Sequence, residues 1–187
     1  VMERLRSILK CAVAAFLATV LFLSPVHADE AELEALLEGL KTAESSSATQ
    51  IEQRIYDLWS RSGSEAMDLL LERGRAALTE GDATLAVEHF TALIDHAPGF
   101  AEGYNARATA FFQKGQYGLS LDDIRQTLAL NPRHFGAISG LALILEELGR
   151  REDALAAWRE VERLHPNQQG LSDALLRLER VVDGETL

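Results

Sequence analysis

Two pairs of adjacent carboxylates, Asp122-Asp123 and Glu146-Glu147, are the residues of this chain best suited to acid–base chemistry. Paired carboxylates perform such chemistry when their surroundings drive their pKa values apart. Both pairs fall in polar stretches, and adjacent residues of a helix point about 100° apart. The pattern therefore predicts that they lie on a solvated helix face and not in a catalytic site.

Metal or cofactor chemistry has equally little support. Beyond residue 28 the histidines are His89, His96, His134 and His165, none of which are four residues apart, and no cysteine is present. A metal site on helices would be expected to have histidines four residues apart or cysteine ligands. The motifs GxxxxGK[ST], GxGxxG and GxSxG are also missing. We predict no catalytic residue, no metal and no cofactor, and therefore a protein that is not an enzyme.

Residues 1–28 have the pattern of a cleavable signal peptide. Arg4, Arg6 and Lys10 precede an apolar run of 13 residues, and small residues follow, ending at Ala28. Thirteen residues span about 20 Å as a helix, less than the roughly 30 Å hydrocarbon core of a bilayer. An uncleaved membrane anchor is the alternative. We expect cleavage, no stable membrane anchor afterwards, and a periplasmic protein.

The remaining chain is cysteine-free and acidic. Cys11 lies within the predicted signal segment, and removing residues 1–28 changes the net charge from −11 to −13. A thiol-free chain suits an oxidising compartment. So acidic a surface repels nucleic acid and anionic lipid, so we expect no nucleic acid as partner.

Residues 29–63 are predicted to form an N-terminal helical hairpin. Leucines at positions 33, 36, 37 and 40 describe one face of a helix, and Ser45 to Ser47 interrupt it. A second helix follows, with Ser47 and Gln50 placed as a capping box and an apolar stripe that ends at Trp59.

From residue 67 the chain repeats every 34 residues, in the blocks 67–100, 101–134 and 135–168. The three repeats and the few residues that lead into them occupy residues 64–168. Proline recurs at one block position and glycine at another: Pro98, Pro132 and Pro166; Gly81, Gly115 and Gly149. Glycine lets the chain leave a helix in a left-handed conformation, and proline stops the next helix. Each block is therefore predicted to be a helical hairpin, and hairpins of this kind must stack to bury their apolar faces.

Other block positions agree. The eighth residue is small (Gly74, Ala108, Ala142), which allows close approach of the second helix of the hairpin. An apolar stripe within residues 169–187 predicts a C-terminal capping helix followed by a tail that frays.

These features resemble the tetratricopeptide repeat (TPR), whose aromatic, Gly, Tyr, Ala, Phe and Pro pattern has this period. The resemblance implies an all-α fold, a right-handed superhelical solenoid of three helix-turn-helix repeats. Arg73 and Arg107 depart from the family's usual leucine at the seventh position, which could loosen the packing or mark an edge. The amino-acid sequence of residues 55–63 and 90–98 also resembles that of small secreted TPR proteins of alphaproteobacteria.

In this family the first helices of successive repeats line a concave groove that receives a peptide or a helix. Carried over by block position, the groove residues include the following: Leu71, Arg75, Asn105, Thr109, Phe112, Leu143, Glu146 and Glu147. No lysine is among them, so a grip on a C-terminal carboxylate is disfavoured. We expect a partner with an apolar anchor against Leu71, Phe112 and Leu143, and with a basic group near the two glutamates. Equally, Leu71 and Leu143 could pack on the terminal helices instead.

The resemblance and the predicted signal peptide favour a periplasmic adaptor or scaffold that binds an envelope protein. The alternative is a self-associating structural protein of the cell envelope, a homodimer paired through leftover apolar surface on residues 33–59. The sequence leaves open whether the N-terminal hairpin blocks the groove.

Overall fold

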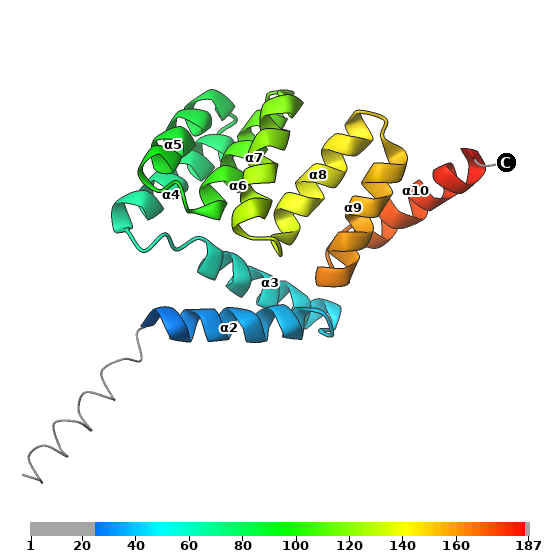
Figure 1. Ribbon diagram of the computed structural model, residues 1–187, viewed down its shortest axis with the longest axis horizontal. Helices are drawn as coiled ribbons and strands as arrows, with labels where there is room; N and C mark the ends of the chain where they lie inside the picture. The colour runs from blue at the N-terminus through cyan, green and yellow to red at the C-terminus, as the bar shows by residue number, and fades with distance from the viewer. Residues whose placement is uncertain (1–24, 186–187) are drawn as a thin grey trace, which may run out of the picture.

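The computed structural model describes residues 25–185, and its regular elements in that range are all α-helices (Figure 1). The helices are α2 (Pro25–Leu40), α3 (Ser45–Trp59), α4 (Glu65–Thr79), α5 (Ala83–His96), α6 (Ala101–Gln113), α7 (Tyr117–Leu130), α8 (Phe135–Glu147), α9 (Arg151–Leu164) and α10 (Leu171–Glu185). Helices α4 to α9 form three stacked antiparallel hairpins, which confirms the predicted solenoid.

The predicted signal segment lies outside the described residues up to position 24. Helix α2 begins at Pro25, a residue that is favoured in the first turn of a helix. No helix in the described part of the chain is both long and apolar enough to cross a membrane.

The glycine that recurs in each block has the predicted backbone role. Gly81, Gly115 and Gly149 follow α4, α6 and α8, and their φ angles are +84°, +68° and +72°. Residues with a Cβ atom rarely adopt this left-handed conformation. Each glycine therefore permits the tight turn between the two helices of one hairpin.

Close packing inside the first hairpin depends on Gly74 in the middle of α4. A Cβ atom at this position would lie 2.2 Å from Cε1 of Phe90, which belongs to α5 and is fully buried. The small residue thus makes room for an aromatic ring, as the eighth block position predicts.

The first helices of the repeats lie side by side, with α4 packed on α6 and α6 packed on α8. Helix α8 packs less closely on α7 than α6 does on α5. The junction between the second and third repeats is therefore looser than the junction between the first and second. Helices α4, α6 and α8 form the inner surface.

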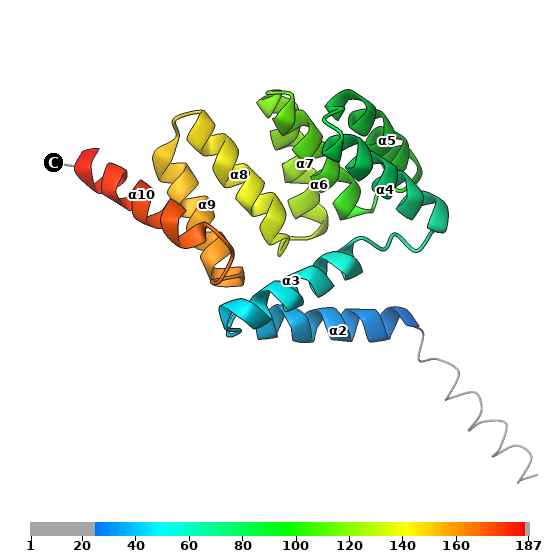
Figure 2. The same cartoon turned by 180° about the vertical axis from the view of Figure 1, so that it is seen from behind.

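The N-terminal hairpin of α2 and α3 runs below the row of repeats in Figures 1 and 2. Although α4 follows it directly in sequence, its core residues Leu40, Ile55 and Trp59 share one cluster with α8, α9 and α10. Two contacts fix this docking: Arg133 pairs with Glu34, and Asn167 donates to the carbonyl of Ala43.

This docking covers the apolar surface from which self-association was predicted. Leu37, Leu40, Ile55, Leu58 and Trp59 are all buried, with exposed fractions of 9% or less, within the single chain. A homodimer paired through residues 33–59 would have to uncover them, so that alternative loses the surface on which it rested.

At the C-terminal end of the repeats, α10 packs on α9 of the third repeat. Leu171, Leu175 and Leu178 are buried in the same cluster as the hairpin. The predicted apolar stripe of a terminal capping helix therefore packs as expected, and one core joins both ends of the described chain.

Two sequence predictions about charged residues are wrong. Asp123 is not on a solvated face: it is 6% exposed, and its carboxylate accepts two hydrogen bonds from Arg107, at 2.8 and 2.9 Å. Arg107 also donates to Thr91 of α5 at 3.1 Å. The arginine that replaces the usual leucine thus joins α5, α6 and α7 and does not mark an edge.

Candidate binding pocket

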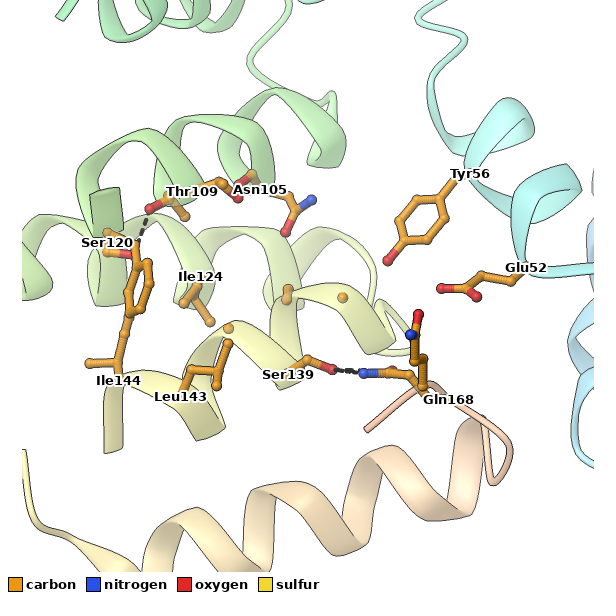
Figure 3. Close-up of a pocket in the computed structure, with 16 residues that line it drawn as sticks. Glu52, Tyr56, Asn105, Thr109, Ser120, Ile124, Ser139, Leu143, Ile144 and Gln168 are labelled. Atoms are coloured by element: carbon orange, nitrogen blue, oxygen red, sulfur yellow. Dashed lines mark hydrogen bonds between the residues drawn. The ribbon is translucent and has the colours of Figure 1, made fainter. Parts of the chain in front are cut away.

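A pocket of about 390 Å³ lies at the looser junction between the second and third repeats (Figure 3). It is bounded by α6 and α7 on one side, α8 on another, and α3 and the α9–α10 loop at one end. The lining residues are Glu52, Tyr56, Asn105, Ala108, Thr109, Phe112, Ser120, Ile124, Gly136, Ala137, Ser139, Gly140, Leu143, Ile144, Gln168 and Gln169.

The structure brings together four of the predicted groove residues in this pocket: Asn105, Thr109, Phe112 and Leu143. Leu143 is 44% exposed, and so its side chain is available to a ligand. The Thr109 hydroxyl donates to the carbonyl of Asn105, and the Asn105 amide donates to Glu102 at 3.2 Å. The Asn105 side chain is therefore held in place at the pocket wall.

Leu71 and Arg75 of α4 do not join them. Leu71 is 2% exposed and packs in the core of the first hairpin, so it offers no surface to a partner. Arg75 donates to Glu102 at 2.5 Å and to the Ser60 hydroxyl at 3.0 Å. The expectation that Leu71 provides part of an apolar anchor site is therefore wrong, because α5 and α6 cover it.

Glu146 and Glu147 lie outside the pocket, and Glu146 already has partners. Its carboxylate accepts hydrogen bonds from Arg177 of α10 and, at 2.7 Å, from the Trp158 indole of α9. Burial alone would raise the pKa of Glu146, but these two hydrogen bonds outweigh it and hold the pKa below its ordinary value. The predicted basic group of a partner therefore has no free carboxylate at Glu146.

We expect replacement of Glu146 by Gln to weaken the fold at neutral pH but not in acid. A carboxylate whose pKa is lower in the folded state stabilises that state above its unfolded pKa, and this contribution is lost as the pH falls through the folded pKa. Since Arg177 is largely exposed, the effect should be only about 0.5–1 kcal/mol at pH 7. Urea unfolding at pH 7 and pH 3.5 measures it, with Glu147→Gln as the exposed control. A difference that grows on acidification would contradict the assignment.

The hairpin contributes two pocket residues that the sequence prediction missed, Glu52 and Tyr56 of α3. They are four residues apart, so they lie on one helix face, beside the apolar stripe of Ile55 and Trp59. The sequence shows this spacing, but the spacing does not predict that this helix face packs against α8. The sequence left open whether the hairpin blocks the groove. In the structure the hairpin forms the end wall of the pocket without filling it.

Tyr56 lies where α3 packs against the start of α8. A Cβ atom at Gly136 would lie 2.4 Å from the Tyr56 hydroxyl oxygen, and the Tyr56 ring packs edge-on against Phe135 at 5.3 Å. Burial raises the pKa of Tyr56 far above its usual value, so the phenol stays protonated. Gly136 thus allows the hairpin wall to close on the third repeat.

We expect Gly136→Ala to destabilise the protein by about 1–3 kcal/mol, because the added methyl group overlaps the Tyr56 hydroxyl. Tyr56→Phe in the same chain should recover most of the loss. The matched control is Gly140→Ala in the same helix, whose Cβ atom would meet only Ile124 Cδ1 at 3.5 Å. Thermal unfolding of these three variants and of wild type tests this, and equal effects at Gly136 and Gly140 would count against the close approach.

A buried network behind the wall fixes its position. Glu102, 4% exposed, accepts hydrogen bonds from Arg75, Asn105 and, at 2.8 Å, from Nε2 of His134. His134 Nδ1 accepts from the backbone N–H of Ala137 and so caps α8, which assigns the ring proton to Nε2. Trp59 of the hairpin stacks on the His134 ring with centroids 4.4 Å apart. The network therefore joins α3, α4, α6 and α8 around the pocket.

His165, the C-cap residue of α9, also lies under the hairpin. It is 1% exposed, and its Nε2 atom lies 3.4 Å from the Glu52 carboxylate without the geometry of a hydrogen bond. Within the described residues, no group of three or more histidines, cysteines and carboxylates could hold a metal ion. The pocket instead offers apolar surface, amides, hydroxyls and one carboxylate.

Stacked helical hairpins with a ligand-sized pocket on their inner surface define a helical-repeat protein of the solenoid class. Comparison with known proteins identifies the repeat. The tetratricopeptide repeat family model matches residues 105–169. A TPR repeat-containing protein of Rhizobium etli is 32% identical over 169 residues, which cover 80% of this chain and 82% of that protein. The chain belongs to the tetratricopeptide repeat family.

Solved structures agree with this fold. The TPR domain of Arabidopsis OM64 is 26% identical, with a TM-score of 0.59 over 62% of this chain and 96% of that domain. The first TPR of Spaghetti (RPAP3), bound to the HSP90 peptide SRMEEVD, is 22% identical, with a TM-score of 0.60 over 63% of this chain and 93% of that one. TPR domains are protein-interaction modules, and the Spaghetti TPR domain is bound to a peptide.

Proposed function

We propose that this chain is a non-catalytic adaptor that holds a peptide or helix of a partner protein, with an apolar side chain of the partner inserted into the pocket between α6 and α8. The observation that carries the proposal is the exposure of Leu143, 44% on an inner helix, beside Phe112 and Ile124. Burying these side chains under a partner residue would be favourable by the hydrophobic effect.

The compartment is part of the proposal. Residues 1–28 have the pattern of a signal peptide, and the chain beyond them is cysteine-free and carries a net charge of −13. We therefore propose a periplasmic adaptor whose partner is an envelope protein. Export followed by removal of residues 1–28 is tested by fractionating cells and sequencing the N-terminus of the recovered protein.

The peptide held by the Spaghetti TPR domain supports the general mode of binding but not its chemistry. That peptide, SRMEEVD, is acidic. The pocket of this chain has one charged lining residue, which is the carboxylate of Glu52. A different partner sequence is therefore expected.

The test is crosslinked capture of partners from intact cells by wild type, by two matched single variants and by one double variant. Leu143→Glu places a charge inside the pocket, whereas Leu119→Glu places it at a leucine that is 49% exposed and outside the pocket. We expect Leu143→Glu, and equally Asn105→Ala with Phe112→Ala, to lose a partner that Leu119→Glu retains, with helicity unchanged in circular dichroism. Equal capture by all variants would refute the pocket as the binding site.

A further inference from the structure

The two ends of the pocket differ in chemistry (Figure 3). Ile124, Leu143 and Ile144 lie at the end away from the hairpin, whereas Glu52 and Tyr56 lie at the hairpin end with Gln168. A ligand that fills the pocket must therefore present an apolar group at one end and a polar group at the other.

Glu52 is the only lining residue with a formal charge, and its charge is not balanced by a hydrogen-bonded cation among the described residues. Its side chain is 30% exposed, and the nearest basic atom, Nε2 of His165, lies 3.4 Å away without a hydrogen bond. Arg54 in the same helix is engaged by Glu32. The Glu52 carboxylate is thus free to accept hydrogen bonds from a ligand.

Two other groups near the hairpin end supply no free positive charge. Arg75 is committed to Glu102 and Ser60, and Tyr56 stays a neutral phenol because burial raises its pKa. The chain as a whole has a net charge of −11. The electrostatic potential at the hairpin end therefore favours a cation and disfavours a carboxylate.

From this charge and from the placement of Glu52, we propose that the pocket selects a partner segment with a lysine or arginine side chain close to its apolar anchor. The anchor packs against Leu143 and Ile124, and the ammonium or guanidinium group donates hydrogen bonds to the Glu52 carboxylate. The inference rests on the proposed function and adds to it the chemistry that the partner must present. The basic group of the partner is thus proposed to contact Glu52, and not Glu146 and Glu147 as the sequence predicts.

Synthetic peptides test this directly. Acetylated and amidated octapeptides of Gly and Ser would carry one Leu and, one to three residues away, Lys, Gln or Glu. Binding to the ¹⁵N-labelled full chain is followed by NMR at the backbone amides of Gly136 and Gly140, which line the pocket. Because a charge-assisted hydrogen bond strengthens binding, we expect the best Lys peptide to bind about tenfold more tightly than its Gln counterpart, and the Glu peptide to bind most weakly.

Matched variants separate this inference from the proposed function. Glu52→Gln should abolish the preference for Lys while the Leu-dependent shifts at Gly140 persist. Glu72→Gln makes the same charge change at an exposed residue outside the pocket and should keep the preference. Equal binding of the Lys, Gln and Glu peptides by wild type, or a Lys preference that survives Glu52→Gln, would overturn the inference alone. Absence of shifts with every peptide would overturn the pocket assignment and the inference together.

Discussion

Replacing Asp123 by Ala should destabilise the protein by about 3–5 kcal/mol, because it leaves the Arg107 guanidinium without its carboxylate in a largely buried site. The Arg107 side chain is 19% exposed, and its pKa is raised by the hydrogen bonds to Asp123. Its guanidinium also lies 5.9 Å from the Tyr104 ring centroid and 5.8 Å from that of Phe111, which offer no second counter-charge.

Urea denaturation with circular dichroism measures this effect. The adjacent Asp122→Ala is the matched control, since Asp122 is exposed and pairs only with Arg125 one helical turn on, so it should cost less than about 0.5 kcal/mol. Adding Arg107→Leu, the residue usual in the family, to Asp123→Ala should recover most of the stability. Equal costs at positions 122 and 123 would contradict the buried pair.

Truncating Trp59 to Ala should have an effect of similar size, about 3–5 kcal/mol, because this side chain fixes the hairpin to the repeats. It is 9% exposed, stacks on His134, and lies 5.1 Å from Phe135 between ring centroids. The hairpin would then undock while the first repeat keeps its own core around Phe90 and Leu93.

Limited proteolysis shows undocking separately from unfolding. The connection from residue 60 to 64 should become the first cleavage site in Trp59→Ala, and the Leu-containing peptides should no longer shift Gly136. Trp59→Phe keeps a ring against His134 and should behave in between. A cleavage pattern and peptide binding like those of wild type would show that Trp59 does not hold the pocket wall.

The repeats could be predicted from the sequence because their determinants are local. Glycines at one block position and prolines at another fix where each helix ends, and the small residue at Gly74 fixes how closely its partner helix approaches. Block position also placed Asn105, Thr109, Phe112 and Leu143 on one surface. These inferences need only the helical period and the 34-residue repeat.

Contacts between distant parts of the chain could not be predicted in this way. The pairs Glu34–Arg133 and Ala43–Asn167 are 99 and 124 residues apart, and no period reports them. Helix starts also shifted: α3 begins at Ser45 with Glu44 as N-cap, so the capping box predicted at Ser47 and Gln50 is wrong. Here the turn after α2 decides the first residue of the helix, and the Ser47 hydroxyl donates to the carbonyl of Glu44 instead.

Charged residues were the hardest to place. Asp123 and Glu146 each belong to an acidic pair that looks solvated, yet each faces a basic residue of another helix, Arg107 and Arg177. The identity of the partner is set by how the hairpins stack, and not by the residues beside the carboxylate. For the same reason Glu52 escaped notice as a pocket residue.

The most direct test of the central claim is site-specific photocrosslinking in intact cells, with a benzophenone amino acid at position 143 or, as the control, at position 119. We predict an adduct with a separate protein from position 143 and none from position 119, and loss of that adduct when Phe112 is changed to Ala. Adducts of equal yield from both positions, or an adduct at position 143 only with a second copy of this chain, would contradict it.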